Sequence, residues 1–327
     1  MKVHILDDWY DVLRGLPGFA LLDGHDVTVW TGRAPDEATL ATRLKGAEAV
    51  VLFRDRTAIS PALATQLEGV KLIAMRGQHD HVDAEALSRA GVMFCSHMAK
   101  DGPSTSTAEL TFGLIIAALR YLPDQIASAR AGQWQGGAPL GRNVAGKVLG
   151  LYGYGKIAQA VAAYARVFGM VVQYWGSDEG RGRARAAGET VPPSREAFFA
   201  TSDVISLHQR LTPATRHGVT RADLMATKPD SVLVNTARAA LVEPGAVLAA
   251  LEAGHIGRAA LDVHAGEPVT DPDDPLLAHP KVIPTPHVGF VTAEELDRQF
   301  RDIYALVNAF ATGTPQHVIT PATGGCP

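Results

Sequence analysis

VLGLYGYGKIAQAVAAYARVFG, residues 148–169, is the stretch that decides the fold. It joins a short β-rich run to a helix-forming run through Gly153-Tyr-Gly155-Lys-Ile-Ala158, a turn of the form G-x-G-x-x-A. The first glycine permits the tight turn, the second lets the backbone approach a pyrophosphate, and the small Ala158 lets helix and strand pack closely. Backbone N–H groups that follow the glycines, at Lys156 and Ile157, then face the anion. The stretch predicts dinucleotide binding; the alternative is a tight turn without a ligand.

Short β-rich runs alternate with helix-forming stretches on both sides of this turn. Examples are VHIL (3–6) and AVVLF (49–53) before it, and DVISLH (203–208) and SVLVNTA (231–237) after it. Alternation of this kind predicts βα units and parallel sheets, and apolar strands fit sheets buried on both faces. We therefore predict an α/β fold with two Rossmann-like or flavodoxin-like parallel-sheet domains and a cleft between them.

Two long helices are predicted where the chain crosses between the domains, at residues 106–121 and 292–311. Each begins with a capping-box pattern of Ser or Thr followed three residues later by Glu. The predicted dinucleotide-binding domain spans residues 104–291. The predicted substrate-binding domain combines residues 1–103 with 292–327.

The composition narrows the possible classes of protein. The chain has 327 residues, 46% of them hydrophobic and 20% charged, with a net charge of −4, so nothing indicates binding to nucleic acid or to an acidic membrane. Two cysteines exclude a disulfide framework and suit a reducing compartment. The longest apolar run, residues 110–119, is shorter than the roughly 20 residues of a membrane span. We predict a cytoplasmic protein.

The strand after the turn, MVVQYW (170–175), bears on the choice of cofactor. An acidic residue that bonds the adenosine ribose is expected about 20 positions after the glycines. That place carries Trp175 or Gly176, and Ser177 follows with three nearby arginines, Arg181, Arg183 and Arg185. A missing carboxylate and nearby Ser and Arg side chains favour NADP(H) slightly over NAD(H). The arginines are also compatible with a solvated helix face.

Several motifs in order give the chain a family resemblance. They are STAELTFGLIIAALR, LYGYGKIAQAVA, SLHQRLTPATR, VNTARAALVE, AALDVHAGEP and TPHVG. With these motifs the chain resembles the D-isomer-specific 2-hydroxyacid dehydrogenases, which include D-lactate, glyoxylate/hydroxypyruvate and phosphoglycerate dehydrogenases. The resemblance implies an enzyme that transfers a hydride between a nicotinamide cofactor and a small 2-oxo acid or D-2-hydroxy acid.

The resemblance also implies three catalytic residues, Arg238, Glu267 and His287. A planar guanidinium such as Arg238 suits the carboxylate of a 2-oxo acid. A protonated imidazole such as His287 can donate a proton to the carbonyl oxygen as the hydride adds to the carbon. A carboxylate such as Glu267, bonded to the other ring nitrogen, orients the imidazole and favours its charged form.

Further contacts follow from the same resemblance. Those expected at the cofactor are Gly153, Gly155, Lys156, Ile157, Ala158, Trp175, Ser177, His208, Thr236, Ala237, Asp262 and Thr107. For His208 the alternative is a histidine that only packs at a strand end.

The expected substrate contacts are Arg54, Arg76 and the backbone N–H groups of Gly77 and Gln78. The segment Arg76-Gly-Gln-His-Asp-His-Val-Asp83 departs from the family's glycine-rich substrate loop, because Arg76 and Gln78 occupy places that are often glycine. For Arg54 and Arg76 the alternative is a surface salt bridge. The nearby histidines have no metal-ligand spacing, and we predict no metal site.

The resemblance also implies one partner, a second copy of the chain, and leaves two alternative functions open. A homodimer through the arm at residues 123–147 is expected. A nucleotide-sensing, corepressor-like protein of the same fold is one alternative function. A same-fold oxidoreductase with another substrate, such as phosphite, is the second alternative.

Overall fold

The computed structural model describes residues 1–98 and 105–319, and the chain forms two compact units. The first unit is Met1–Gly102 with Thr292–Pro327, and the second is Pro103–Val291. The predicted boundary between residues 103 and 104 lies outside the described residues. In the described ranges, no helix combines the length and the apolar character that a membrane span requires.

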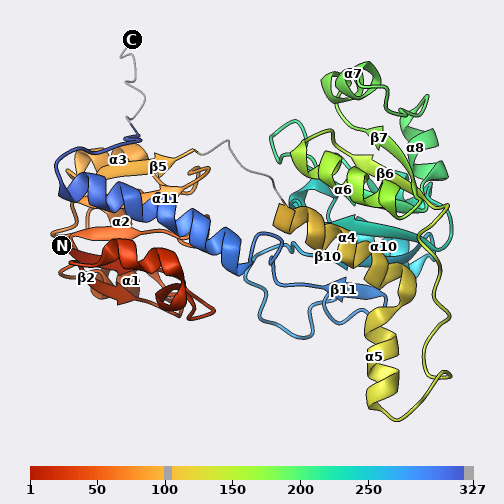
Figure 1. The fold of residues 1–327 in the computed structure, drawn as a ribbon, viewed down its shortest axis with the longest axis horizontal. Coiled ribbons are helices and arrows are strands. Elements are labelled where there is room, and N and C mark those ends of the chain that lie inside the picture. Colours follow the sequence, from red (N-terminus) through yellow and green to blue (C-terminus); the bar gives the residue numbers. More distant parts are fainter. Residues whose placement is uncertain (99–104, 320–327) are drawn as a thin grey trace. The chain divides into compact units, whose positions relative to one another are not determined.

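The first unit is a five-stranded parallel sheet with helices on both faces (Figure 1). Its strands, in the spatial order β2-β1-β3-β4-β5, are β1 (Lys2–Ile5), β2 (Asp26–Val29), β3 (Ala49–Val51), β4 (Leu72–Arg76) and β5 (Met93–His97). Its helices are η1 (Leu13–Gly15), η2 (Pro17–Leu22), α1 (Glu37–Arg43), α2 (Pro61–Ala64), α3 (Ala84–Arg89) and α11 (Ala293–Ala311). This strand order is the flavodoxin-like one.

The C-terminal helix α11 completes the first unit, although it is distant in sequence. Leu296, Phe300, Ile303 and Leu306 are buried at helical spacing, and α11 packs on η2, β4 and β5. Helices α1, α2 and α3 share a core cluster with the other face of the sheet. Thr292 caps α11 by accepting a hydrogen bond from the Glu295 amide, as its capping-box pattern predicts.

The second unit is a six-stranded parallel sheet. Its strands, in the spatial order β11-β10-β9-β8-β6-β7, are β6 (Val148–Tyr152), β7 (Val171–Trp175), β8 (Val204–Leu207), β9 (Ser231–Asn235), β10 (Ile256–Leu261) and β11 (Val282–Pro284). Its helices are α4 (Thr105–Arg120), α5 (Leu122–Arg130), α6 (Lys156–Val167), α7 (Asp178–Ala186), α8 (Arg195–Thr201), α9 (Arg221–Met225), η3 (Ala239–Leu241) and α10 (Ala246–Glu252).

Alternate residues of these strands feed two separate cores. In β9, Val232 and Val234 pack with α4 and α6, whereas Leu233 packs with α8, α9 and α10. This alternation follows from the two-residue period of a strand, and apolar residues at every position leave both faces buried. The prediction of two parallel-sheet α/β domains is confirmed.

The chain after α4 differs from the prediction. The sequence predicts an arm, not a helix, at residues 123–147 after the helix at 106–121. Instead Tyr121 adopts a left-handed conformation (φ 51°) and Pro123 lies in the first turn of α5, because proline is well tolerated at a helix start. Figure 1 shows α5 extending beyond the sheet of its unit. Arg258 of β10 anchors it through an ion pair with Asp124 at 2.7 Å.

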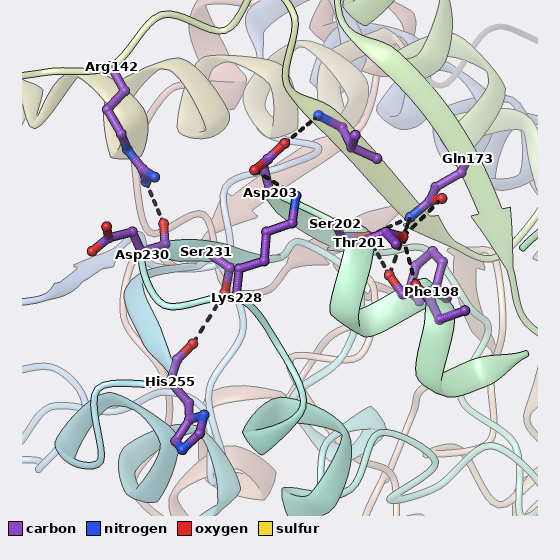
Figure 2. Close-up of polar contacts among 12 residues, drawn as sticks. Arg142, Gln173, Phe198, Thr201, Ser202, Asp203, Lys228, Asp230, Ser231 and His255 are labelled. Atoms are coloured by element: carbon purple, nitrogen blue, oxygen red, sulfur yellow. Dashed lines mark hydrogen bonds and ion pairs between the residues drawn. The ribbon is translucent and has the colours of Figure 1, made fainter.

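Polar side chains form hydrogen bonds near the amino ends of several strands of this sheet (Figure 2). Asp203 accepts hydrogen bonds from the Val148 amide at 2.8 Å and from Lys228 at 3.0 Å. Burial opposes the charge of Asp203, but these bonds lower its pKa. The buried Gln173 donates to Ser202 at 2.9 Å. Each of these groups already has a protein partner, so this edge has a structural role.

Candidate functional site

The carboxyl ends of the second unit's strands carry most of the predicted site. All six strands are parallel, so the segments after β6, β8, β9, β10 and β11 leave the sheet at the same edge. The strand order reverses at β6, which lies between β7 and β8. In open α/β sheets, ligands bind outside the carboxyl ends at such a switch point.

The glycine turn after β6 is shaped for a close approach. Gly153 has φ 130°, and a Cβ at this position would lie 2.7 Å from the His208 carbonyl carbon. Gly155 precedes α6, and a Cβ there would meet open space. Ala158 is fully buried against the sheet. Gly153 thus packs closely against the His208 backbone, whereas the space beside Gly155, at the start of α6, is open. This shape fits a bound pyrophosphate.

The end of β7 places Trp175 and Ser177 differently. The Trp175 ring is buried, stacks on Phe198 and is covered by the Arg181 guanidinium at 4.3 Å. Ser177 is exposed and caps α7, since its hydroxyl accepts a hydrogen bond from the Gly180 amide. Arg181 also donates to the Gly176 carbonyl and pairs with Asp178.

Arg183 is more accessible than Arg181. Its side chain is 58% exposed, with a weak contact to Glu179 at 3.7 Å. The guanidinium lies 5.8 Å from the ring of Tyr154, which is the residue between the two glycines of the turn. An anion at this turn would therefore meet Arg183 before Arg181.

After β8, the ring of His208 is held by Ser206, with 2.8 Å between Nε2 and the hydroxyl. Burial lowers the pKa of His208 to about 4. The ring is therefore neutral near pH 7 and can act there as a hydrogen-bonding group without adding charge.

After β9, Asn235 shapes the turn that carries Arg238. Its side chain accepts from the Ala237 amide at 3.0 Å and donates to the Arg238 carbonyl at 3.0 Å. Arg238 is half-buried, and its Nη1 donates to the Ala237 carbonyl at 2.7 Å. The Nε–Nη2 edge takes no part in that bond and has the fork geometry that matches a carboxylate.

Two threonines of α4 lie beside this turn, and the sequence analysis identified only one. Thr107 lies next to Gly289, where an added Cβ would be 3.4 Å from the Thr107 methyl group. Thr111, one helical turn later and fully buried, forms a hydrogen bond with Thr236 at 2.7 Å. The four-residue spacing of the two threonines within an apolar helix was the available signal.

Asp262, after β10, is fully buried and organises the segment that follows β11. Its carboxylate accepts hydrogen bonds from the Thr285 hydroxyl at 2.6 Å, the Val288 amide at 2.8 Å and the Gly289 amide at 2.9 Å. Burial raises the pKa of Asp262, and these three bonds offset the effect only in part. The carboxylate thus fixes the backbone on both sides of His287.

Glu267 and His287 are brought together from the segments after β10 and β11. The His287 Nδ1 lies 2.5 Å from the Glu267 Oε2, and the ring packs edge-on against Phe290. Burial would raise the pKa of Glu267, but hydrogen bonds from His287 and from the His264 amide outweigh burial and lower it. With Nδ1 turned to Glu267, Nε2 is the ring nitrogen that can face a reacting group.

The predicted substrate contacts lie in the first unit, after β3 and β4. Arg54 has φ 58°, and its Nη1 is 3.5 Å from the Gln299 side chain. Arg76 pairs with Asp302 at 2.7 Å and is 11% exposed, as in the salt-bridge alternative. The Gly77 amide donates to the His97 carbonyl at 3.2 Å. Gln78 is exposed.

Metal ligands were also sought among these groups. Across residues 1–98 and 105–319, no cluster of three or more His, Cys, Asp or Glu side chains has a geometry that could hold a metal ion.

Comparisons with known proteins give consistent results. A family model described as D-isomer specific 2-hydroxyacid dehydrogenase, NAD binding domain, matches residues 112–289. The chain is 34% identical over 300 residues to a glyoxylate reductase of Aeropyrum pernix, and the match covers 88% of each protein. It is 42% identical to a phosphoglycerate oxidoreductase from Vibrio cholerae O395, whose crystal structure matches with a TM-score of 0.90 over 96% of this chain and 99% of that one.

A third relative is longer. The chain is 35% identical over 270 residues to a D-3-phosphoglycerate dehydrogenase of Methanocaldococcus jannaschii, a match that covers 82% of this chain and 50% of that protein. The chain thus spans about half the length of the curated D-3-phosphoglycerate dehydrogenases it matches.

Proposed function

The chain belongs to the D-isomer-specific 2-hydroxyacid dehydrogenases, and from this premise we propose that it transfers a hydride between a nicotinamide cofactor and a small 2-oxo acid or D-2-hydroxy acid. The observation that carries the proposal is the 2.5 Å contact between Glu267 and His287 at the strand edge that also carries Arg238. A bound, reduced nicotinamide would supply the hydride.

His287 is the proposed proton donor. Glu267 accepts a hydrogen bond from Nδ1 and favours the imidazolium, which leaves the Nε2 proton for the substrate carbonyl oxygen. As negative charge develops on that oxygen, the imidazolium stabilises it and then transfers the proton. In the reverse direction, the neutral ring accepts the proton from the hydroxyl group.

Arg238 is proposed to bind the substrate carboxylate through its Nε–Nη2 edge. Its orientation is set by the Ala237 carbonyl and, through the backbone, by Asn235. Because the fork is held in place before the substrate arrives, less side-chain entropy is lost on binding. Arg54 and the exposed Gln78 amide are proposed as further substrate contacts.

The second unit is proposed to hold the dinucleotide. The pyrophosphate would lie over Gly155 and meet N–H groups at the start of α6, in Lys156, Ile157 and Ala158. The groups proposed to line the rest of the cofactor site are Gly153, Ser177, His208, Thr236, Ala237, Asp262 and Thr107. Because the Trp175 ring is buried, we propose that it acts on the cofactor site indirectly, by packing against the Arg181 guanidinium.

We further propose a preference for NADP(H) over NAD(H). Trp175 and Gly176 replace the acidic residue at the end of β7, and Arg183 is exposed beside the glycine turn. Removing this cation should weaken binding of a 2′-phosphate but not of a 2′-hydroxyl group. Arg183→Ala is expected to raise the KM for NADPH about tenfold while the KM for NADH changes little. A wild type that prefers NADH would contradict this assignment.

A homodimer through the arm at residues 123–147 is the proposed assembly. Trp134 and Leu140 are 87% and 93% exposed, and Ile126 adds a further exposed apolar side chain on α5. Large apolar side chains gathered on one segment are typical of an interaction surface.

The test of the activity is the oxidation of NADPH and NADH, followed at 340 nm, with glyoxylate, hydroxypyruvate, pyruvate, phenylpyruvate and phosphohydroxypyruvate. Turnover with any of these supports the reaction class. His287→Ala should lose about 100- to 10,000-fold in kcat and keep its cofactor affinity. Cofactor binding without turnover of any 2-oxo acid in the wild type, or normal turnover in His287→Ala, would overturn the proposal.

A further inference from the structure

His264 lies between Asp262 and Glu267 and has no role in the chemistry above, yet it contacts both segments that build the catalytic pair. Its backbone amide donates to the Glu267 Oε1 at 2.7 Å. Its ring Nε2 lies 3.0 Å from the Thr285 carbonyl oxygen, two residues before His287. One residue of the β10 segment therefore fastens both the carboxylate and the β11 segment.

Four hydrogen bonds join His264, Glu267, His287 and Thr285 in a closed cycle. The Glu267 carboxylate accepts one bond from the His264 amide and one from the His287 ring. The Thr285 carbonyl accepts one bond from the His264 ring and one, at 3.0 Å, from the His287 amide. Each acceptor is thus shared by the same two histidines, and the cycle links the segments after β10 and β11 at two points.

We propose that His264 is a positioning residue that holds Glu267 against His287 through its Nε2–H bond to the Thr285 carbonyl. A carbonyl oxygen only accepts, so the proton of this bond is on Nε2. The role rests on the proposed function only in taking His287 as the proton donor; the cycle itself does not depend on it.

The competing explanation is that His264 acts as a nearby positive charge. Both His264 and His287 lie close enough to Glu267 to act on its carboxylate by charge. A charge acts on His287 without needing the Thr285 bond, so any neutral replacement of His264 would have the same effect. Loss of positioning depends on the donor alone, because a misplaced Glu267 weakens its hydrogen bond to the His287 Nδ1–H.

Two variants separate the two explanations. His264→Phe keeps a ring of similar size but has neither the donor nor the charge. His264→Gln loses the charge but places an amide N–H near the position of Nε2. Should the Phe variant fail to fold, His264→Leu removes the same donor with a smaller side chain.

The experiment is proton NMR of the His287 Nδ1–H in the full chain, with the resonance assigned by its absence in His287→Ala. We expect this resonance to move upfield in His264→Phe, because the bond to Glu267 weakens, and to stay near its wild-type position in His264→Gln. In 2-oxo acid reduction, the Phe variant should also lose about five- to tenfold in kcat, as for one lost hydrogen bond, with an unchanged KM for the cofactor.

An unchanged Nδ1–H resonance in His264→Phe, or equal shifts in both variants, would overturn the positioning role. The NMR measurement needs no substrate. A wild type that reduces none of the 2-oxo acids would therefore contradict the proposed function without deciding the role of His264.

Discussion

The ionised Glu267 couples the proposed catalytic pair, Glu267 and His287, to the stability of the second unit. Its pKa is lower in the folded chain because hydrogen bonds from His287 and from the His264 amide outweigh burial. A carboxyl group with a lowered folded pKa contributes stability that is present above its unfolded pKa, about 4.3, and is lost as the pH falls through the folded value. Replacement of Glu267 by a neutral residue should therefore lower the free energy of unfolding at neutral pH, and lower it less in acid.

The measurement is urea unfolding of wild type and Glu267→Gln from neutral pH downwards. We expect the variant to have the lower free energy of unfolding near neutral pH, and the difference to shrink below about pH 4. Glu252→Gln, at the exposed end of α10, is the matched control and should show no such trend. A difference that is independent of pH would show that the Glu267 charge contributes no stability.

Substitution of Arg238 tests whether the planar shape of its side chain, or only the positive charge, matters for binding the substrate carboxylate. A lysine keeps the charge but has no planar fork, so Arg238→Lys should raise the KM for the 2-oxo acid or lower kcat, with a loss in kcat/KM of about 10- to 100-fold. Cofactor affinity should not change. Arg216→Lys, an exposed arginine of the same unit, is the control. Full activity in Arg238→Lys would remove Arg238 from this role.

The residues could be predicted from sequence to different extents. Arg238, Glu267 and His287 were predicted from motifs of the family resemblance, and each lies in the segment that follows a strand of the second unit. Arg76 could not be placed in this way, because its partner Asp302 is 226 residues later. The same is true of the Gly77 amide, which is bonded across to β5. Long-range partners decide which polar groups remain for a ligand.

At the scale of elements, the glycine turn separates folding from cofactor binding. At Gly153, a Cβ would collide with the His208 backbone at a φ that disfavours side chains. At Gly155, a Cβ would enter open space at an ordinary φ of −107°. The first glycine is therefore required by the fold, and the second by what occupies the space above it.

Gly153→Ala should cost about 1–3 kcal/mol in the free energy of unfolding, measured by urea denaturation. Gly155→Ala should unfold like the wild type but bind NADPH and NADH at least about tenfold more weakly, because its methyl group occupies the pyrophosphate position. Binding can be followed by quenching of tryptophan fluorescence. Wild-type affinity in Gly155→Ala would place the cofactor elsewhere.

Strand positions followed well from the sequence, whereas α5 did not. The residues of β6 coincide with the β-rich run at 148–152, because an apolar run interrupted only by Gly150 lies between Lys147 and the turn at Gly153. Around Pro123, one proline is compatible with ending a helix or beginning one. The left-handed Tyr121 and the tertiary ion pair of Asp124 decide between them, and neither is visible in a local window.

At the scale of the whole molecule, the exposed segment after α4 leads to the last prediction. Asp124 ties α5 to the buried Arg258, whose guanidinium also lies 4.6 Å from the Tyr121 ring. The helix is thus held firmly while Trp134 and Leu140 beyond it are almost fully exposed. A rigidly anchored segment with large exposed apolar groups is suited to a second copy of the chain, which would remove those groups from water.

Leu140→Asp should convert a dimer into a monomer, because the new charge would have to be desolvated in the interface. Light scattering after gel filtration measures the outcome as a fall from twice the chain mass to the chain mass of 34.6 kDa. Leu21→Asp places the same change at an exposed position of η2 in the first unit and should leave the dimer intact. A wild type that is already monomeric, or a dimeric Leu140→Asp, would exclude this segment as the interface. If dissociation also lowers turnover while each chain remains folded, the dimer supports catalysis as well as solubility.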